Sequence, residues 1–176
     1  MRCGFAPCTA VAPRVLEQEK SDLSAQQAVM DGISFVRKIR DDGVEYPPIG
    51  TFIGFALTKI ENGYLEAVGT PTAAHYNPLG VVHGGFSSTL MDLALGLVSL
   101  TTMPSMENHV TTADLTLRYL RPIFASTGQM TVAAAVLHAG RRTIVAEASL
   151  RGGDQKLYTL AQSTLLIVAP VGAGKA

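Results

Sequence analysis

A long apolar stretch in the middle of the chain constrains the fold more than any other feature. Across residues 84–103 the side chains are apolar, small or hydroxylic, and Asp92 alone is charged. A helix that is apolar nearly all round must be buried on most of its surface. We therefore expect a central helix over residues 84–103, begun by a Gly-Gly pair and stopped by Pro104. The stretch is long enough to span a bilayer, but Asp92 and the hydroxyls favour a helix buried in protein, with no membrane partner.

The segments around this helix have the alternating pattern of β-strands. Residues 51–60 and 64–72 are predicted to form a hairpin, with Asn62-Gly63 as its turn. Four further strands are predicted after the helix, over residues 110–120, 129–138, 143–151 and 156–168. Short connections favour antiparallel pairing. The predicted class is α+β, with an antiparallel sheet wrapped around one long central helix.

An additional helix is predicted ahead of this domain. Residues 24–40 place apolar side chains on one helical face, with Ser24 as the cap and Asp41-Asp42-Gly43 as the end. Residues 45–48 read as a rigid connector because they end in two prolines. We expect an N-terminal extension over residues 1–48, the main domain over 49–169 and a flexible tail over 170–176. Whether the extra helix covers a pocket or an oligomer interface is left open.

Composition excludes several classes of function. Hydrophobic residues make up 47% of the chain and charged residues 16%, with a net charge of zero, which favours a compact and oligomeric protein over a disordered one. Because no run of Lys and Arg occurs, a nucleic-acid partner is not expected. Cys3 and Cys8 are too few for a disulfide framework or a zinc site, so no metal is expected. The first residues lack the apolar run of an export signal, and we expect a cytoplasmic protein.

Three short motifs occur together around the central helix. Asn77 is followed six residues later by His83-Gly84-Gly85, Asp92 comes nine residues after the histidine, and the next strand ends in Tyr-Leu-Arg-Pro at residues 119–122. Together they resemble the hot-dog-fold acyl-CoA thioesterases related to the phenylacetic-acid pathway, within the 4-hydroxybenzoyl-CoA thioesterase superfamily. The resemblance covers about residues 50–168. It implies the hot-dog fold, hydrolysis of acyl-CoA without a cofactor, and a homodimer or homotetramer with sites shared between subunits.

The residues themselves point to the same chemistry. The first N–H groups of a helix have no partner within it, and glycine lets another group approach them closely. With the positive end of the helix dipole they would stabilise a carbonyl oxygen that gains negative charge, so Gly84 is the candidate for polarising a thioester. Asp92 is the candidate general base or nucleophile. It lies eight residues on, about 12 Å along a helix axis, so two antiparallel helices across a two-fold axis would bring each Asp92 to its partner's Gly84.

The resemblance implies roles for further residues. Asn77 and His83 would position the water or the substrate oxygen, and the Thr112 hydroxyl would help to hold that water. Gly85 and Phe86 would contact the substrate, together with the loop residues Arg141 and Arg142, an arginine pair suited to the phosphates of CoA. Arg118 and Arg121 are further candidates for the phosphates. The acyl pocket is expected along the helix, near Phe86, Leu90, Met91 and Leu93.

Each candidate also has a structural interpretation. Asp92 could bond a buried backbone group, His83 a loop carbonyl, the glycine pair could serve tight packing, and the arginine pair could be a solvated turn. At the level of function, the alternative is a hot-dog module that binds acyl-CoA without turnover. A hydratase on the same fold would need a histidine paired with an acid in a different motif, which the sequence lacks. The identity of the acyl group is left open.

Overall fold

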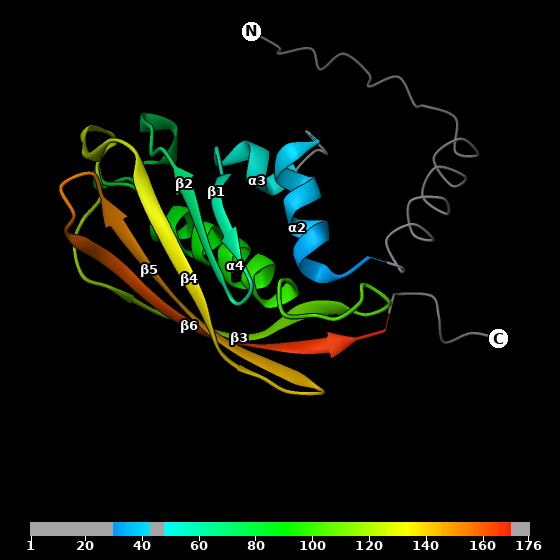
Figure 1. Cartoon of the computed structure of the whole chain (residues 1–176). Coiled ribbons are helices and arrows are strands. Elements are labelled where there is room, and N and C mark those ends of the chain that lie inside the picture. The colour runs from blue at the N-terminus through cyan, green and yellow to red at the C-terminus, as the bar shows by residue number, and fades with distance from the viewer. Residues whose placement is uncertain (1–29, 43–47, 170–176) are drawn as a thin grey trace, which may run out of the picture.

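Six strands form one antiparallel sheet that curves around a single long helix (Figure 1). The computed structural model describes residues 30–42 and 48–169. The strand order is β1-β2-β4-β5-β6-β3, and every neighbouring pair is antiparallel. The strands are β1 (Ala56–Glu61), β2 (Tyr64–Gly69), β3 (His109–Tyr119), β4 (Met130–Ala139), β5 (Thr143–Gly152) and β6 (Leu157–Val168). Strands β1 and β3 are the two edges of the sheet.

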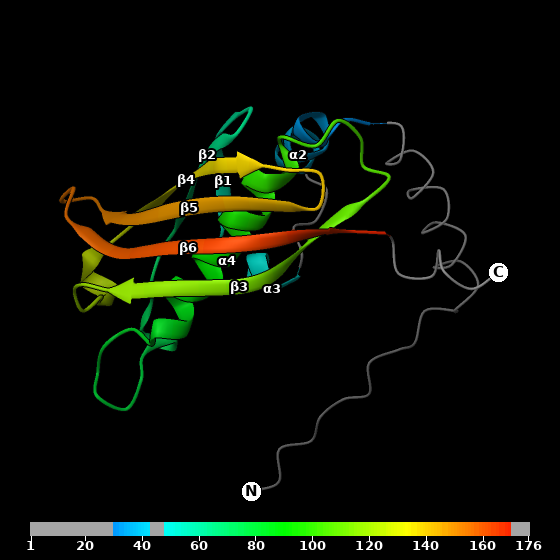
Figure 2. The same ribbon diagram turned by 90° about the horizontal axis from the view of Figure 1, so that it is seen from below.

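The central helix α4 (Gly84–Leu100) supplies one side of the hydrophobic core. Strands β4, β5, β6 and β3 run side by side across it when the molecule is viewed from below (Figure 2). Side chains of α4 interleave with the inward residues of the sheet, and the largest that are almost completely buried are Leu65, Leu90, Met91, Leu95, Met130, Ile144, Leu150 and Leu165. The predicted architecture, an antiparallel sheet wrapped around the 84–103 helix, is confirmed. The helix ends at Leu100, three residues before the predicted end, and Thr101 is its C-cap.

The strand residues alternate between the core and the outside. In β2 every second residue is buried, and β4 and β5 repeat the pattern over most of their length. This is the period of two that a sheet with one covered face requires. The four strands predicted after α4 are all present, with ends within one residue of the predicted positions. The Asn62-Gly63 turn is also confirmed, and Gly63 has the positive φ of 75° that such turns need.

The predicted N-terminal helix is shorter than expected. Helix α2 spans Gly32–Asp41, and its N-cap is Asp31, whose carboxylate accepts from the Ser34 N–H at 2.7 Å. A single helix that runs without interruption from residue 24 was predicted, with Ser24 as its cap. This is wrong, because Asp31 is a non-helical N-cap. Residues 24–29 lie outside the described part of the chain. Helix α2 packs on the C-terminal end of α4, where the Gly32 N–H donates to the Met103 carbonyl at 3.0 Å. It covers the end of α4 opposite to Gly84.

The segment before the hairpin is also helical where a strand was predicted. Residues Pro48–Phe52 form the short helix α3, and β1 begins only at Ala56. Two backbone bonds close the turn, from Ile53 to the Ile49 carbonyl at 3.2 Å and from Phe55 to the Gly50 carbonyl at 2.9 Å. Pro48 fits the first turn of a helix, where its missing N–H costs nothing. The apolar run that looked like a strand is thus a helical turn anchored on the core by Ile53.

The second hairpin strand and two short turns complete the described structure. The second hairpin strand ends at Gly69, three residues before the predicted end, and η1 (Ala73–His75) and η2 (Ala125–Thr127) are single 3₁₀ turns in the loops. The predicted flexible tail, residues 170–176, lies outside the described part, and the domain division stays a prediction. No helix among the described residues is both long and apolar enough to cross a membrane.

The contact between α2 and α4 leads to a prediction on stability. A Cβ added at Gly32 would lie 1.8 Å from the Leu100 carbonyl oxygen, a backbone atom that cannot move aside. We expect Gly32→Ala to lower the free energy of unfolding by about 1–3 kcal/mol, measured by urea denaturation. Arg37→Ala, at an exposed position of α2, is the matched control and should change stability by less than about 0.5 kcal/mol. Equal stability of the two variants would contradict the close approach of α2 to α4.

Candidate active site

The N-terminus of α4 is capped by the side chain of His83. The residue has an extended backbone, with φ −60° and ψ 138°, and its Nδ1 accepts from the Gly85 N–H at 2.8 Å. The Phe86 N–H donates to the His83 carbonyl at 3.0 Å. A Cβ at Gly85 would lie 2.9 Å from His83 Nδ1, so the second glycine leaves space for the ring. The His83 ring therefore accepts a hydrogen bond from a backbone N–H and does not bond a loop carbonyl, as the alternative interpretation had it. Because the Gly85 N–H is engaged in this bond, it is not available to a ligand.

Gly84 is left as the open donor at this helix end. Its N–H has no hydrogen-bond partner among residues 30–42 and 48–169. Tyr119, at the end of β3, lies against Gly84, with its hydroxyl 3.4 Å from the Gly84 carbonyl oxygen. A Cβ at Gly84 would meet the Tyr119 ring at 3.2–3.3 Å, so tight packing contributes to the choice of glycine here as well. One unsatisfied N–H at the positive end of a 17-residue helix is suited to bind a developing oxyanion.

Asn77 shapes the loop that leads into α4. Its side-chain oxygen accepts from the Leu79 N–H at 2.9 Å and, more weakly, from the Val81 N–H at 3.4 Å. The base of the loop is closed by a bond from the His83 N–H to the His75 carbonyl at 2.8 Å. The Asn77 side-chain NH₂ makes no hydrogen bond to any described residue. The amide group is thus fixed by its oxygen, and its nitrogen is available to a ligand.

Asp92 and Thr112 are brought together from different elements. The Thr112 hydroxyl on β3 donates to Asp92 Oδ1 at 2.8 Å, and the Asp92 side chain is partly exposed. A bulge between Thr112 and Asp114 shifts the register of β3 against β6 next to Thr112. The alternative in which Asp92 bonds a buried backbone group has no support among the described contacts. The resemblance implied only that the Thr112 hydroxyl helps to hold the water, and the structure adds its bond to Asp92.

Gly84 and Asp92 remain apart within one chain. Eight helical residues separate them, which is about 12 Å along α4. A thioester carbonyl held at the Gly84 N–H is therefore out of reach of the same chain's carboxylate. The structure of the single chain supplies two halves of a site.

Two cavities flank the N-terminus of α4. One has a volume of about 320 Å³ on the Gly84 side and is lined by Val82, Gly84, Ser87, Tyr119, Leu120, Arg121, Pro122 and Ile123. The other has a volume of about 350 Å³ on the Gly85 side and is lined by residues of α3, η1 and α4. Of the predicted pocket residues, only Phe86 lines either of them. Leu90 and Met91 do not, because both point into the sheet and are 1% and 0% exposed, and Leu93 packs against the same core.

The predicted phosphate-binding arginines lie far from Gly84 of the same chain. Arg142 is at the β4–β5 turn, where its carbonyl accepts from the Ile167 N–H. Tyr119, which touches Gly84, pairs with Thr159 at the other end of β6, and eight strand residues span about 26 Å. Arg142, and with it the neighbouring Arg141, thus lies away from the Gly84 N–H of its own chain, and the role of the pair stays a prediction. Arg118 lines a hollow with Tyr64 and Glu147 on the opposite face of the sheet from α4.

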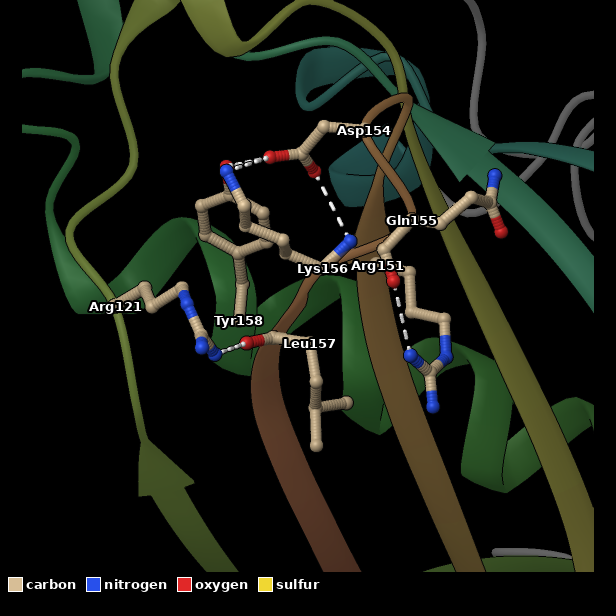
Figure 3. A network of polar contacts seen from close by, with 7 residues as sticks. All are labelled: Arg121, Arg151, Asp154, Gln155, Lys156, Leu157 and Tyr158. Atoms are coloured by element: carbon tan, nitrogen blue, oxygen red, sulfur yellow. Dashed lines mark hydrogen bonds and ion pairs between the residues drawn. The ribbon is translucent and has the colours of Figure 1, made fainter.

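A second basic group lies at the Gly84 end of the sheet, around the β5–β6 turn (Figure 3). Arg121 lines the Gly84-side cavity and donates to the Leu157 carbonyl, while Arg151 donates to the Gln155 carbonyl at 3.0 Å. Lys156 forms an ion pair with Asp154 at 3.1 Å. Desolvation by itself would raise the pKa of the Asp154 carboxyl, but hydrogen bonds from Lys156 and Tyr158 lower it below its usual value. Sequence reasoning ranked Arg121 below the Arg141–Arg142 pair, although its Tyr-Leu-Arg-Pro motif was a usable signal.

Comparison with known proteins agrees with this fold. The sequence model of the thioesterase superfamily matches residues 79–159, which include the α4 N-terminus, Asp92 and Thr112. The conserved protein PA5202 of Pseudomonas aeruginosa is 31% identical, over 70% of this chain and 95% of its own, with a TM-score of 0.64. The chain belongs to the thioesterase superfamily. It is a thioester hydrolase with the hot-dog fold, as the sequence resemblance implied.

Two further structures place it within that family. Thioesterase PA1618 of the same organism, solved as a mutant, is 25% identical over 69% of this chain and 86% of its own, with a TM-score of 0.64. The PaaI protein from the phenylacetic acid degradation operon of Escherichia coli is 22% identical over 78% of this chain and 96% of its own, with a TM-score of 0.68. The second likeness is one of fold.

The cap formed by His83 leads to a prediction. We expect His83→Ala to lower the free energy of unfolding by about 0.5–2 kcal/mol in urea denaturation, because the Gly85 N–H loses its acceptor. His83→Asn should recover most of this loss, since asparagine is among the best N-cap residues. If asparagine destabilises as much as alanine, the capping bond is not what the imidazole contributes.

Proposed function

We propose that the protein hydrolyses acyl-CoA thioesters to a free carboxylate and CoA, at two sites formed across a homodimer. The observation that carries the proposal is the pair of half-sites on α4. Gly84 offers an unpaired N–H at the helix start, and Asp92 offers a carboxylate held by Thr112 two turns further on. The two groups are complementary, since one stabilises negative charge on oxygen and the other activates a nucleophile.

The reaction follows from these groups. The thioester oxygen accepts a hydrogen bond from the Gly84 N–H, and a water held by the partner's Asp92 attacks the carbonyl carbon as the carboxylate takes its proton. The tetrahedral intermediate collapses, the C–S bond breaks, and the thiolate of CoA takes that proton. Attack by the Asp92 carboxylate itself would give an anhydride that water then opens, with the same products. Neither route uses a cofactor, and the free amide nitrogen of Asn77 and the Thr112 hydroxyl are the groups that would orient the water.

The exposed edge of the sheet supports the dimer. Strand β3 has 11 residues, pairs only with β6, and leaves most of its residues exposed. A long unpaired edge without proline or lysine is a template for pairing with another strand. Antiparallel pairing of two β3 edges around a two-fold axis extends the sheet. It also sets two α4 helices antiparallel on the same side, each with its Asp92 toward the other's N-terminus.

The outward face of α4 supports the same arrangement. Ser88, Asp92 and Gly96 lie at spacings of four residues and are partly exposed, whereas their neighbours on the sheet side are buried. A Cβ at Gly96 would meet nothing within 4 Å, so packing within the described chain does not require glycine there. Small side chains along one face let a second helix approach closely. A homodimer explains the glycine, and a tetramer would need a further interface.

Coenzyme A as the leaving group has two supports. The protein smu.793 of Streptococcus mutans, with 23% identity over 65% of this chain and 89% of its own and a TM-score of 0.60, was solved bound to acetyl CoA. In this chain, Arg121 lines the Gly84-side cavity and Lys156 lies at the adjoining turn between β5 and β6. Such side chains suit the phosphates of CoA. In a two-fold dimer, Arg141 and Arg142 of the partner would be further candidates.

The direct test is the Asp92→Asn variant. We expect its thiol release from a panel of acyl-CoAs to fall on the order of a hundredfold or more, with folding intact, because the amide cannot take a proton. Asp114→Asn is the matched control, since Asp114 is an exposed acid on β3 whose side chain bonds the Thr164 N–H instead. Wild type that binds acyl-CoA but releases no thiol would establish the binding module in place of the enzyme. Equal hydrolysis by wild type and Asp92→Asn would remove Asp92 from the mechanism.

The Gly84 N–H can be tested by a matched pair of substitutions. Gly84→Pro deletes the N–H at the first helical position, where proline is tolerated, and the ψ of 138° at His83 suits a residue before proline. Gly84→Ala adds a similar Cβ beside Tyr119 but keeps the N–H. We expect kcat of Gly84→Pro to fall by about a hundredfold to a thousandfold and Gly84→Ala to stay much closer to wild type. Equal losses would show that crowding of Tyr119, not the donor, is responsible.

Mixing these variants tests whether the site is shared. Heterodimers of Asp92→Asn and Gly84→Pro subunits contain one site in which both groups are intact. After denaturation and refolding of an equal mixture, about a quarter of wild-type activity should return, although each parent is inactive. No recovery, in a mixture shown to contain heterodimers, would contradict sites formed by Gly84 of one subunit and Asp92 of the other.

A further inference from the structure

We propose that the cavity on the Gly85 side of α4 holds the acyl group of the substrate, and that Phe52 on α3 limits the length of that group. The proposal rests on the function proposed above and adds a specificity-determining residue to it. It also assigns a direction to the substrate, with the acyl group on one flank of the helix N-terminus and CoA on the other.

The cavity is built from three elements that converge at the start of α4. Its volume is about 350 Å³, and its walls are Ile49, Phe52 and Ile53 near α3, Ala74, His75 and Tyr76 near η1, and His83, Gly85, Phe86 and Thr89 at the start of α4. This volume lies within the usual range of small-ligand sites. Gly85 and His83 are direct neighbours of the Gly84 N–H along the chain. A carbonyl held at that N–H therefore has the cavity within reach on one side.

The chemistry of the walls selects an uncharged, apolar occupant. Among residues 30–42 and 48–169, no Asp, Glu, Lys or Arg lines the cavity. Its polar groups are largely engaged, since Thr89 Oγ1 donates to the Gly85 carbonyl at 2.8 Å, Tyr76 Oη accepts from the Ala125 N–H at 2.9 Å, and His83 caps the helix. The His75 ring lies against Phe86, with centroids 4.6 Å apart. A carboxylate or ammonium buried here would lose its hydration without a partner of opposite charge.

The opposite flank has a different character. The Gly84-side cavity contains Arg121 and the Tyr119 ring, and Arg121 donates to the Leu157 carbonyl at the start of β6 (Figure 3). The phosphates of CoA carry several negative charges, whereas an aliphatic or aryl acyl group carries none. The two ends of the substrate thus match the two flanks in only one orientation.

Phe52 is the wall residue best placed to set the size of the acyl group. It is 77% exposed at the mouth of the cavity, while the next residue, Ile53, is 5% exposed and anchors α3 on the core. Phe52 is not exposed singly, because Ile49 and Tyr76 of the same cavity are 48% and 38% exposed, and a group of exposed apolar side chains around a cavity is typical of a ligand contact. Helix α3 also lies outside residues 79–159, which match the family as a whole. A determinant in α3 would let this chain select its acyl group without any change at Gly84 or Asp92.

The test compares Phe52→Ala and Phe52→Trp with wild type over a series of straight-chain acyl-CoAs, from butanoyl-CoA to tetradecanoyl-CoA. We expect Phe52→Ala to raise kcat/KM for the longer chains relative to the shorter by about tenfold, and Phe52→Trp to shift the preference in the opposite direction. Leu79→Ala is the control, because Leu79 is 85% exposed in the neighbouring loop and does not line the cavity. Its chain-length profile should follow wild type.

Three other outcomes would distinguish failure of this inference from failure of the proposed function. If wild type hydrolyses acyl-CoA and both Phe52 variants keep the chain-length profile of wild type, the inference is overturned and the proposed function stands. No thiol release from any acyl-CoA by wild type would overturn both. If Phe52→Ala instead dissociates the dimer in sedimentation velocity and the chain-length profile does not shift, Phe52 belongs to a subunit interface and the inference is wrong.

Discussion

The burial of α4 in the curve of the sheet is the interaction on which the rest of the structure depends. A helix with this many apolar side chains cannot remain in water, and the inward faces of the strands supply the surface that covers it. Burial of Leu90, Met91 and Leu95 against the sheet fixes the rotation of the helix about its axis. The opposite face, with Ser88, Asp92 and Gly96, is therefore held outward, and the start of the helix is held at one end of the sheet beside Tyr119.

At the start of α4, one backbone N–H group is used to cap the helix and the one before it is left for a ligand. His83 takes the Gly85 N–H as an N-cap, which stabilises the end of a helix whose first turn carries no acidic side chain. The Gly84 N–H, one residue earlier, stays unpaired among the described residues. A single imidazole thus serves the helix and leaves one donor for a ligand. Both glycines have close neighbours, the His83 ring for Gly85 and the Tyr119 ring for Gly84, so packing and chemistry favour the same residues.

The open edge of β3 relates the fold to the proposed dimer. Thr112 lies on that edge and holds Asp92, so any strand that pairs with β3 comes close to the carboxylate. The same pairing would cover an aggregation-prone edge and complete the site, and one contact would serve stability and function together. The additional elements α2 and α3 take separate places, α2 over the C-terminal end of α4 and α3 beside its N-terminus. Of these two helices, α3 is the one that borders the cavity proposed for the acyl group.

The sequence by itself determined the central helix, five of the six strands to within a few residues, and the Asn77, His83, Gly84 and Asp92 pattern. These features are local, because periodicity, turn residues and motif spacing are visible along the chain. Tertiary structure decided the rest. Residues 51–55 alternate like a strand but form α3 and its C-terminal turn, because backbone bonds and the anchoring of Ile53 override local propensity. Within the described residues the helix predicted over 24–40 begins only after Asp31, where Gly32 approaches the Leu100 carbonyl. That Thr112 bonds Asp92 and that Arg121 lies nearer to Gly84 than Arg142 does both depend on strand order and register, which bring together residues distant in the sequence. The His83 cap is local, since it joins residues two apart in the chain.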